Sequence, residues 1–217
     1  MSKKEITKRY VLCVVSLFIS ALGVAVTKRG ELGVSPISSV SNVLCEKFPS
    51  LSLGTWLFIW NCVLIFGQVL LLRKKFRPIQ LLQIPMSLLF GAFTDIGTMI
   101  SKYLPADIYA AKIALVIAGT IILGLGIALA VIANAIMNSG EAFVKAVSDV
   151  SGKEFGNLKI AFDILCVVTA AVLSLIFFSF RLRGIREGTI IAAAATGLMV
   201  KLFTKLLKTP TEKILKA

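Results

Sequence analysis

The chain has 217 residues, of which 57% are hydrophobic and 16% are charged, and its mean hydropathy is +0.91. A typical soluble domain carries about 25% charged residues, and a globule of this size could not hide so much apolar surface, so the composition excludes a soluble enzyme. The net charge of +13 lies in clusters at the ends of apolar segments, which indicates contact with anionic lipid headgroups of a bilayer and not with nucleic acid.

Six apolar segments are long enough to cross a hydrocarbon core about 30 Å thick, which takes about 20 helical residues. Because lipid offers the backbone no hydrogen-bond partners, we predict that all six are helices. In chain order they cover residues 8–27, 54–73, 79–101, 108–136, 157–180 and 187–208. The basic, apolar N-terminus resembles a signal peptide, but we expect a retained first helix, because this segment has a counterpart later in the chain.

Two shorter stretches, residues 35–48 and 139–151, separate the first span from the second and the fourth from the fifth. Each opens with a serine that can cap a helix, and Pro36 suits a first helical turn. Apolar residues recur in both at helical spacing. Both are too short to span a bilayer, so the sequence predicts either re-entrant half-helices or interfacial helices.

The sequence repeats weakly at a lag slightly above one hundred residues, and both short stretches fall at matching places. The matched segments are Leu22-Gly23-Val24-Ala25 with Leu125-Gly126-Ile127-Ala128, residues 53–61 with 155–163, and Gly91 with Gly197. We therefore predict an all-α, polytopic membrane bundle of two units, residues 1–104 and 105–208, each with three membrane helices and one short helix. Residues 209–217 form a basic cytoplasmic tail.

Three crossings in each unit would turn the second unit upside down relative to the first, which is the inverted repeat common among transporters. Placing the N-terminus in the cytoplasm puts most lysines and arginines inside, with Arg181, Arg183 and Arg186 as the exception. If one short helix crossed the membrane, those arginines would lie inside and the repeat would be parallel. The inverted arrangement is the one we favour.

The turn Gly33-Val34-Ser35-Pro36-Ile37, the amphipathic stretch after it and the Leu53-Gly54 start of the next span resemble the YczE/YyaS/YitT family of bacterial integral membrane proteins. The resemblance covers nearly the whole chain. The second unit departs from it, with Ser139-Gly140 where the pattern would place a proline. The resemblance implies a location in the bacterial inner membrane and names no substrate.

Polar residues within the apolar segments are the candidates for a substrate site, because such residues normally face protein, water or a ligand. Asn61 and Asp163 occupy matching positions of the two units, and we expect both to face one central cavity. The alternative is that they only hold helices together. Glu141, in the first turn of the second short helix, is either a proton-linked carboxylate or a simple complement to the helix dipole.

The starts of the two short helices form a second candidate site, because a helix N-terminus offers free N–H groups and a positive dipole end. Ser35, Ser38, Ser139 and Gly140 would line this site. Flat interfacial helices would instead keep these residues among the headgroups.

The function that these features favour is a small secondary transporter for an unidentified small solute, working by alternating access between the units. The alternative is a membrane scaffold or regulator that transports nothing. The chain has no histidine and no HExxH, GxSxG or P-loop motif, so we expect no enzyme, no cofactor and no metal site. The sequence leaves a homo-oligomer open.

Overall fold

The computed structural model describes residues 2–216, and these residues form eight α-helices and two short 3-10 helices. The two short 3-10 helices, η1 (Arg73–Lys75) and η2 (Pro78–Leu82), precede α4. The α-helices are α1 (Lys3–Arg29), α2 (Pro36–Lys47), α3 (Leu53–Leu72), α4 (Gln83–Ser101), α5 (Tyr109–Ala133), α6 (Ser139–Ser151), α7 (Phe155–Phe177) and α8 (Glu187–Lys216).

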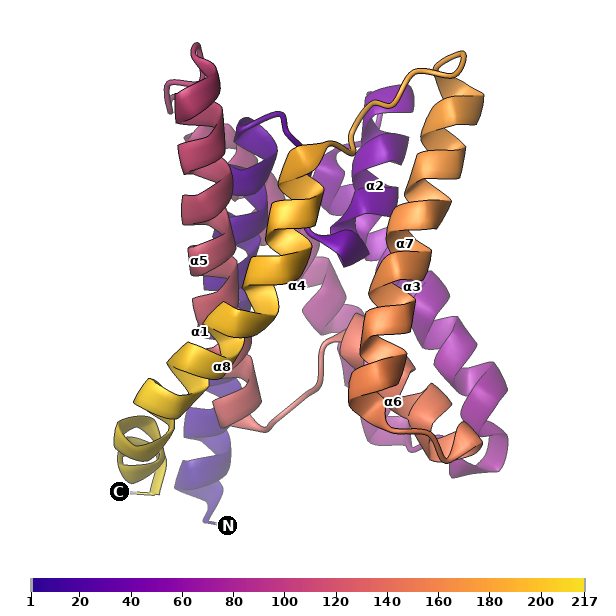
Figure 1. Cartoon of the computed structure of the whole chain (residues 1–217). Helices are drawn as coiled ribbons and strands as arrows, with labels where there is room; N and C mark the ends of the chain where they lie inside the picture. The colour runs from indigo at the N-terminus through magenta and orange to yellow at the C-terminus, as the bar shows by residue number, and fades with distance from the viewer. Residues whose placement is uncertain (1, 217) are drawn as a thin grey trace.

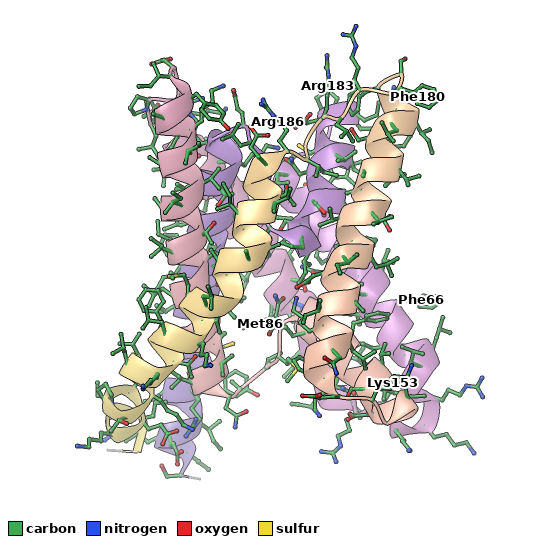
Figure 2. All side chains as sticks on the ribbon, in the orientation of Figure 1. Phe66, Met86, Lys153, Phe180, Arg183 and Arg186 are labelled. Carbon is green, nitrogen blue, oxygen red and sulfur yellow. The ribbon has the colours of Figure 1, made fainter. Side chains whose placement is uncertain are left out.

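Six of these helices, all but α2 and α6, are long and apolar enough to cross a membrane, which confirms the predicted fold class. Their exterior is apolar, as lipid requires: Phe66 of α3 is 63% exposed and points outward (Figure 2). Several predicted ends differ from those in the structure, including the ends of the fourth and the last span. The fourth span stops at Ala133, because Asn134 adopts a left-handed conformation that ends α5. The last helix runs on through Pro210 to Lys216, while Ala217 of the predicted tail lies outside the described residues.

Both termini lie on one face, here called the terminal face, and the opposite face is called the distal face (Figure 1). Helix α1 runs to the distal face, where a turn containing Gly33, with φ +109°, leads the chain back inward. Helix α2 then starts inside the molecule and returns to the distal face (Figure 1). Helix α6 also starts inside and returns to the terminal face. Both short helices are therefore half-helices that enter from opposite faces, not helices lying flat.

The helices pack into two groups that each mix the predicted units. Helices α1, α4, α5 and α8 form the first group, and α2, α3, α6 and α7 form the second. In the second group each half-helix packs chiefly on a helix of the other predicted unit: α2 packs on α7, and α6 packs on α3. The contact between α3 and α4 joins the two groups.

The crossing of α1 and α5 depends on glycine at matching positions. A Cβ atom on Gly23 would lie 2.8 Å from the Gly119 carbonyl oxygen, and one on Gly126 would lie 2.9 Å from the Ser16 carbonyl oxygen. These two contacts are equivalent in the predicted repeat, because the sequence offset that matches Gly23 with Gly126 also matches Ser16 with Gly119. Small residues allow such close backbone approach in membrane bundles, where packing is a main source of helix association.

Replacing Gly23 by alanine is expected to destabilise the protein by about 1–3 kcal/mol, because the new methyl group would collide with backbone atoms of α5. Gly197→Ala is the matched control, since a Cβ built there would meet no atom of another helix within 4 Å in the described part of the chain. Thermal unfolding in detergent measures both variants. Equal melting temperatures for the two variants would contradict the close crossing.

The crossing of α3 and α4 forms a closed contact, here called the distal clasp. Gly54 and Gly91 meet backbone to backbone, and a Cβ on Gly91 would lie 2.5 Å from the Gly54 carbonyl oxygen. Asp95 of α4 caps α3: Gly54 N donates to Oδ1 at 2.8 Å and Ser52 Oγ donates to Oδ2 at 2.5 Å. The carboxylate therefore fixes the start of α3 onto α4.

The matching helices of the second unit, α7 and α8, do not close in this way. Gly156 and Gly197 match Gly54 and Gly91. Within the described residues, however, a Cβ built on Gly197 would meet no atom of another helix within 4 Å, and one on Gly156 would meet only Glu154. Figure 1 shows α7 and α8 diverging toward the terminal face. The two predicted units thus differ in the packing of this pair of helices.

Candidate functional site

The two half-helices meet at their N-terminal ends, where the sequence placed one candidate site. A Cβ built on Gly140 would lie 3.0 Å from Cδ1 of Ile37, so the first turns of α6 and α2 are in contact. Ser35 Oγ donates to Ser38 Oγ at 3.0 Å, and Ser139 is fully buried. Of the predicted residues, the structure brings Gly140 directly against the first turn of α2.

A buried amide cluster, which the sequence analysis missed, holds the start of α6 against α3 and α4. The carboxamides of Gln68 and Gln83 exchange two hydrogen bonds of 3.1 Å, and Gln68 Nε2 also donates to the Ser139 carbonyl oxygen at 3.2 Å. The hydroxyls of Ser87 and Ser139 lie 2.9 Å apart. The sequence feature that could have predicted this cluster is the presence of two glutamines in apolar segments, because a buried amide needs hydrogen-bond partners.

Asn61 and Asp163 are placed differently from each other. Asn61 is 5% exposed, and no hydrogen bond of its side chain is found among residues 2–216. Asp163 forms an ion pair with Lys159 one turn earlier on α7, with 2.5 Å between Nζ and Oδ1. No hydrogen bond or ion pair joins Asn61 to Asp163 in the described part of the chain.

Glu141 of α6 lies near two charged residues of α7. It is half-buried in the first turn of α6, and Lys159 and Asp163 lie close enough to act on it electrostatically. Its carboxylate makes no hydrogen bond within the described residues. The three side chains place two acids and one base beside the meeting point of the half-helices, an arrangement that can hold and exchange a proton or a cation.

Two cavities lie beside the half-helices, one toward each face. The distal pocket has a volume of about 290 Å³ and lies beside Asn42 and Glu46 of α2. The terminal pocket has a volume of about 210 Å³ and lies beside Lys145 and Asp149 of α6. Counted from the first residues of the two half-helices, Pro36 and Ser139, Asn42 occupies the same position in α2 as Lys145 in α6. Glu46 and Asp149 also occupy equivalent positions.

A third cavity of about 20 Å³ lies beside Ser87 and Ser139, and Met86 lines it. Figure 2 shows Met86 between the two helix groups. A space of this size holds about one water molecule.

Six apolar spans, two half-helices that enter from opposite faces and a few buried polar groups between them define a polytopic helical membrane protein. The chain belongs to the Family of unknown function (DUF6198), whose sequence profile matches residues 7–205. Comparisons with curated proteins and with solved structures gave no match.

Proposed function

We propose that the protein is a small secondary transporter that moves a solute by alternating access between two inverted repeats. The contact between Gly140 and Ile37 carries this proposal, because it brings half-helix N-termini from opposite faces together inside the molecule. Transporters built from inverted repeats use discontinuous helices of this kind to surround a solute near the bilayer midplane. A scaffold has no need for buried N–H groups and polar residues at that depth.

The reciprocal contacts support the repeat on which this mechanism depends. Gly23 packs on Gly119 as Gly126 packs on Ser16. Likewise, each half-helix packs chiefly on a long helix of the other unit, α2 on α7 and α6 on α3. The distal and terminal pockets lie beside equivalent turns of α2 and α6. The proposal includes a bacterial inner-membrane location with a cytoplasmic terminal face, since the terminal face carries the basic run from Arg73 to Arg77 and the basic end of α8.

The conformational difference between the units gives the alternating step. The distal clasp is closed here, while the equivalent pair Gly156 and Gly197 is open, so this conformation is the one that opens toward the terminal face. In the other conformation α8 closes on α7 and the distal clasp opens. Lys201 and Glu154 occupy the positions equivalent to Asp95 and Ser52, and their opposite charges would stabilise that closure.

The direct test begins with a thermal-shift screen of ions, amino acids, vitamins and organic anions on purified protein. The solute that stabilises the protein is then measured for uptake into proteoliposomes. Glu141→Gln and Asp163→Asn are expected to lower uptake at least tenfold, and Asp107→Asn, an exposed acid between α4 and α5, is the control that leaves uptake unchanged. Proteoliposomes that take up no stabilising solute would contradict the proposal and favour a scaffold. Unchanged uptake in both variants would remove these two acids from the mechanism.

A further inference from the structure

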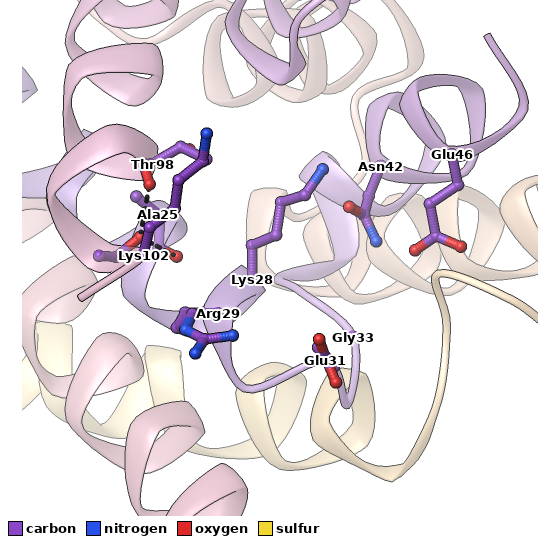
Figure 3. Close-up of a pocket in the computed structure, with 10 residues that line it drawn as sticks. Ala25, Lys28, Arg29, Glu31, Gly33, Asn42, Glu46, Thr98 and Lys102 are labelled. Atoms are coloured by element: carbon purple, nitrogen blue, oxygen red, sulfur yellow. Dashed lines mark hydrogen bonds between the residues drawn. The ribbon is translucent and has the colours of Figure 1, made fainter. Parts of the chain in front are cut away.

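The distal pocket is a cavity lined by several charged residues. It lies where the ends of α1 and α4 face α2, and Figure 3 shows its lining. Its charged lining residues are Lys28, Arg29, Glu31, Glu46 and Lys102. Charged groups at the edge of a membrane protein are normally paired or solvated, so those that face a cavity without a partner point to a ligand.

Two of these charged residues are already engaged. The Glu31 carboxylate pairs with the Lys112 ammonium at 2.5 Å, and this hydrogen bond lowers the pKa of Glu31. Arg29 Nε donates to the Leu104 carbonyl oxygen at 2.9 Å, which holds its guanidinium at the edge of the pocket. These contacts hold Glu31 and Arg29 in the pocket wall, and the other charged residues of the lining remain able to contact a ligand.

The remaining charged groups are poorly engaged. Among the described residues, the Lys28 ammonium donates only to the Cys45 sulfur, at 3.4 Å, and sulfur is a weak acceptor. The side chains of Lys102 and Glu46 make no hydrogen bond or ion pair within residues 2–216. Burial raises the pKa of Glu46, while the charges of Lys28 and Arg183 oppose that rise. Within the described residues, Lys28 therefore has only a weak sulfur contact, while the exposed residues Lys102 and Glu46 have no direct partner in the pocket.

Asn42 supplies an independent sign of a ligand. It is 3% exposed, and its Nδ2 donates to the Gly184 carbonyl oxygen at 2.8 Å, which fixes the orientation of the amide. Its Oδ1 is buried and accepts no hydrogen bond from any residue that the structure describes. Figure 3 shows this oxygen on the side of Asn42 that faces Lys28. A buried acceptor left without a partner costs about 1–3 kcal/mol, a cost that a bound donor would remove.

We propose that the distal pocket binds a small zwitterionic solute of the amino-acid type. Its carboxylate would lie against Lys28 and Lys102, and its ammonium group would donate to Asn42 Oδ1 and Glu46. Figure 3 shows Asn42 and Glu46 on one side of Lys28 and Lys102 on the other, which matches the two ends of such a solute. The volume of about 290 Å³ fits a small amino acid. This inference rests on the proposed transport function, for which the pocket is the site of first recognition at the distal face.

The test measures binding to the purified full-length protein in nanodiscs by calorimetry. The probes are L-alanine, L-serine, L-glutamate and L-lysine, with propionate and propylamine as analogues that each lack one charged group of L-alanine. At least one amino acid is expected to bind at least tenfold more tightly than both analogues. Lys28→Met and Glu46→Gln are expected to weaken that binding at least tenfold. Lys74→Met, a basic residue exposed at the terminal face, is the control that changes nothing.

Three results would overturn the proposal: no binding of any amino acid, propionate or propylamine binding as tightly as the best-bound amino acid, or binding unchanged in both pocket variants. Glu46→Gln keeps the shape of the side chain, so the test stands even where Lys28→Met fails to fold. The assay uses no gradient and no second compartment. An amino acid that binds at Lys28 but is not taken up by proteoliposomes would leave the pocket proposal standing and contradict transport. Uptake of a solute other than an amino acid, unchanged in the Lys28→Met variant, would support transport and contradict the pocket proposal.

Discussion

In a cysteine-free background, a Gly156→Cys/Gly197→Cys variant is expected to form a disulfide in membranes treated with a mild oxidant, although the two positions are apart in this structure. The bond requires α8 to close on α7 as α4 closes on α3 at Gly54 and Gly91. Disulfides form only where Cα atoms come within about 7 Å, so the bond reports that closure. Once it has formed, uptake is expected to fall to background, and a reductant is expected to restore it.

The matched control pairs Gly156→Cys with Leu198→Cys. Leu198 is 64% exposed, and the next position along a helix turns by about 100°, so it presents a different face of α8. The control pair is expected to cross-link at least tenfold more slowly. A failure of the first pair to cross-link would contradict the second conformation, and equal rates for both pairs would indicate loose motion without a defined closure.

Breaking the distal clasp is expected to shift the protein toward the second conformation. Asp95→Ala removes the acceptor of the hydrogen bonds from Ser52 Oγ and Gly54 N, which together stabilise the clasp by about 1–3 kcal/mol. Because about 1.4 kcal/mol changes an equilibrium constant tenfold, the equilibrium between the two conformations should shift by about 5- to 140-fold. The cross-linking rate of the Gly156→Cys/Gly197→Cys pair measures this shift.

Lys201→Met is expected to act in the opposite direction, because it removes the charge that would pair with Glu154 when α8 closes. Lys201 is exposed, so this variant should fold normally even where Asp95→Ala does not. Asp107→Asn, which removes another acid near the distal face, is expected to leave the rate unchanged. A Lys201→Met variant that cross-links as fast as the parent would contradict the role given to this residue.

The sequence predicted the helices well because composition and length decide them. The half-helix starts near Ser35 and Ser139 followed from capping and proline chemistry, and the structure places them within one residue. The exchange of α2 and α6 between the units could not be predicted, since a helix sequence shows which face is apolar and not which helix covers it. The choice between re-entrant and interfacial helices stayed open for the same reason.

The candidate site was predicted less completely. The polar character of Glu141 and Asp163 marked them, but their neighbour Lys159 was not recognised, because its place one turn before Asp163 becomes meaningful only once α6 lies beside α7. Gln68 and Gln83 lie fifteen positions apart, and only the packing of α3 on α4 brings their amides together. The distal pocket combines residues from α1, α2 and α4, whose spacing along the chain carries no common motif.

The contact between the two ends of the chain has a practical consequence. Lys8 Nζ donates to the Ile214 carbonyl oxygen at 3.0 Å, so the first turns of α1 and the last turns of α8 lie together on the terminal face. Fluorescent or phosphatase reporters fused separately to the two ends must therefore show the same compartment. Because the first turns of α1 touch the last turns of α8, the chain also suits a split reporter, whose halves would assemble only when the last helix has inserted.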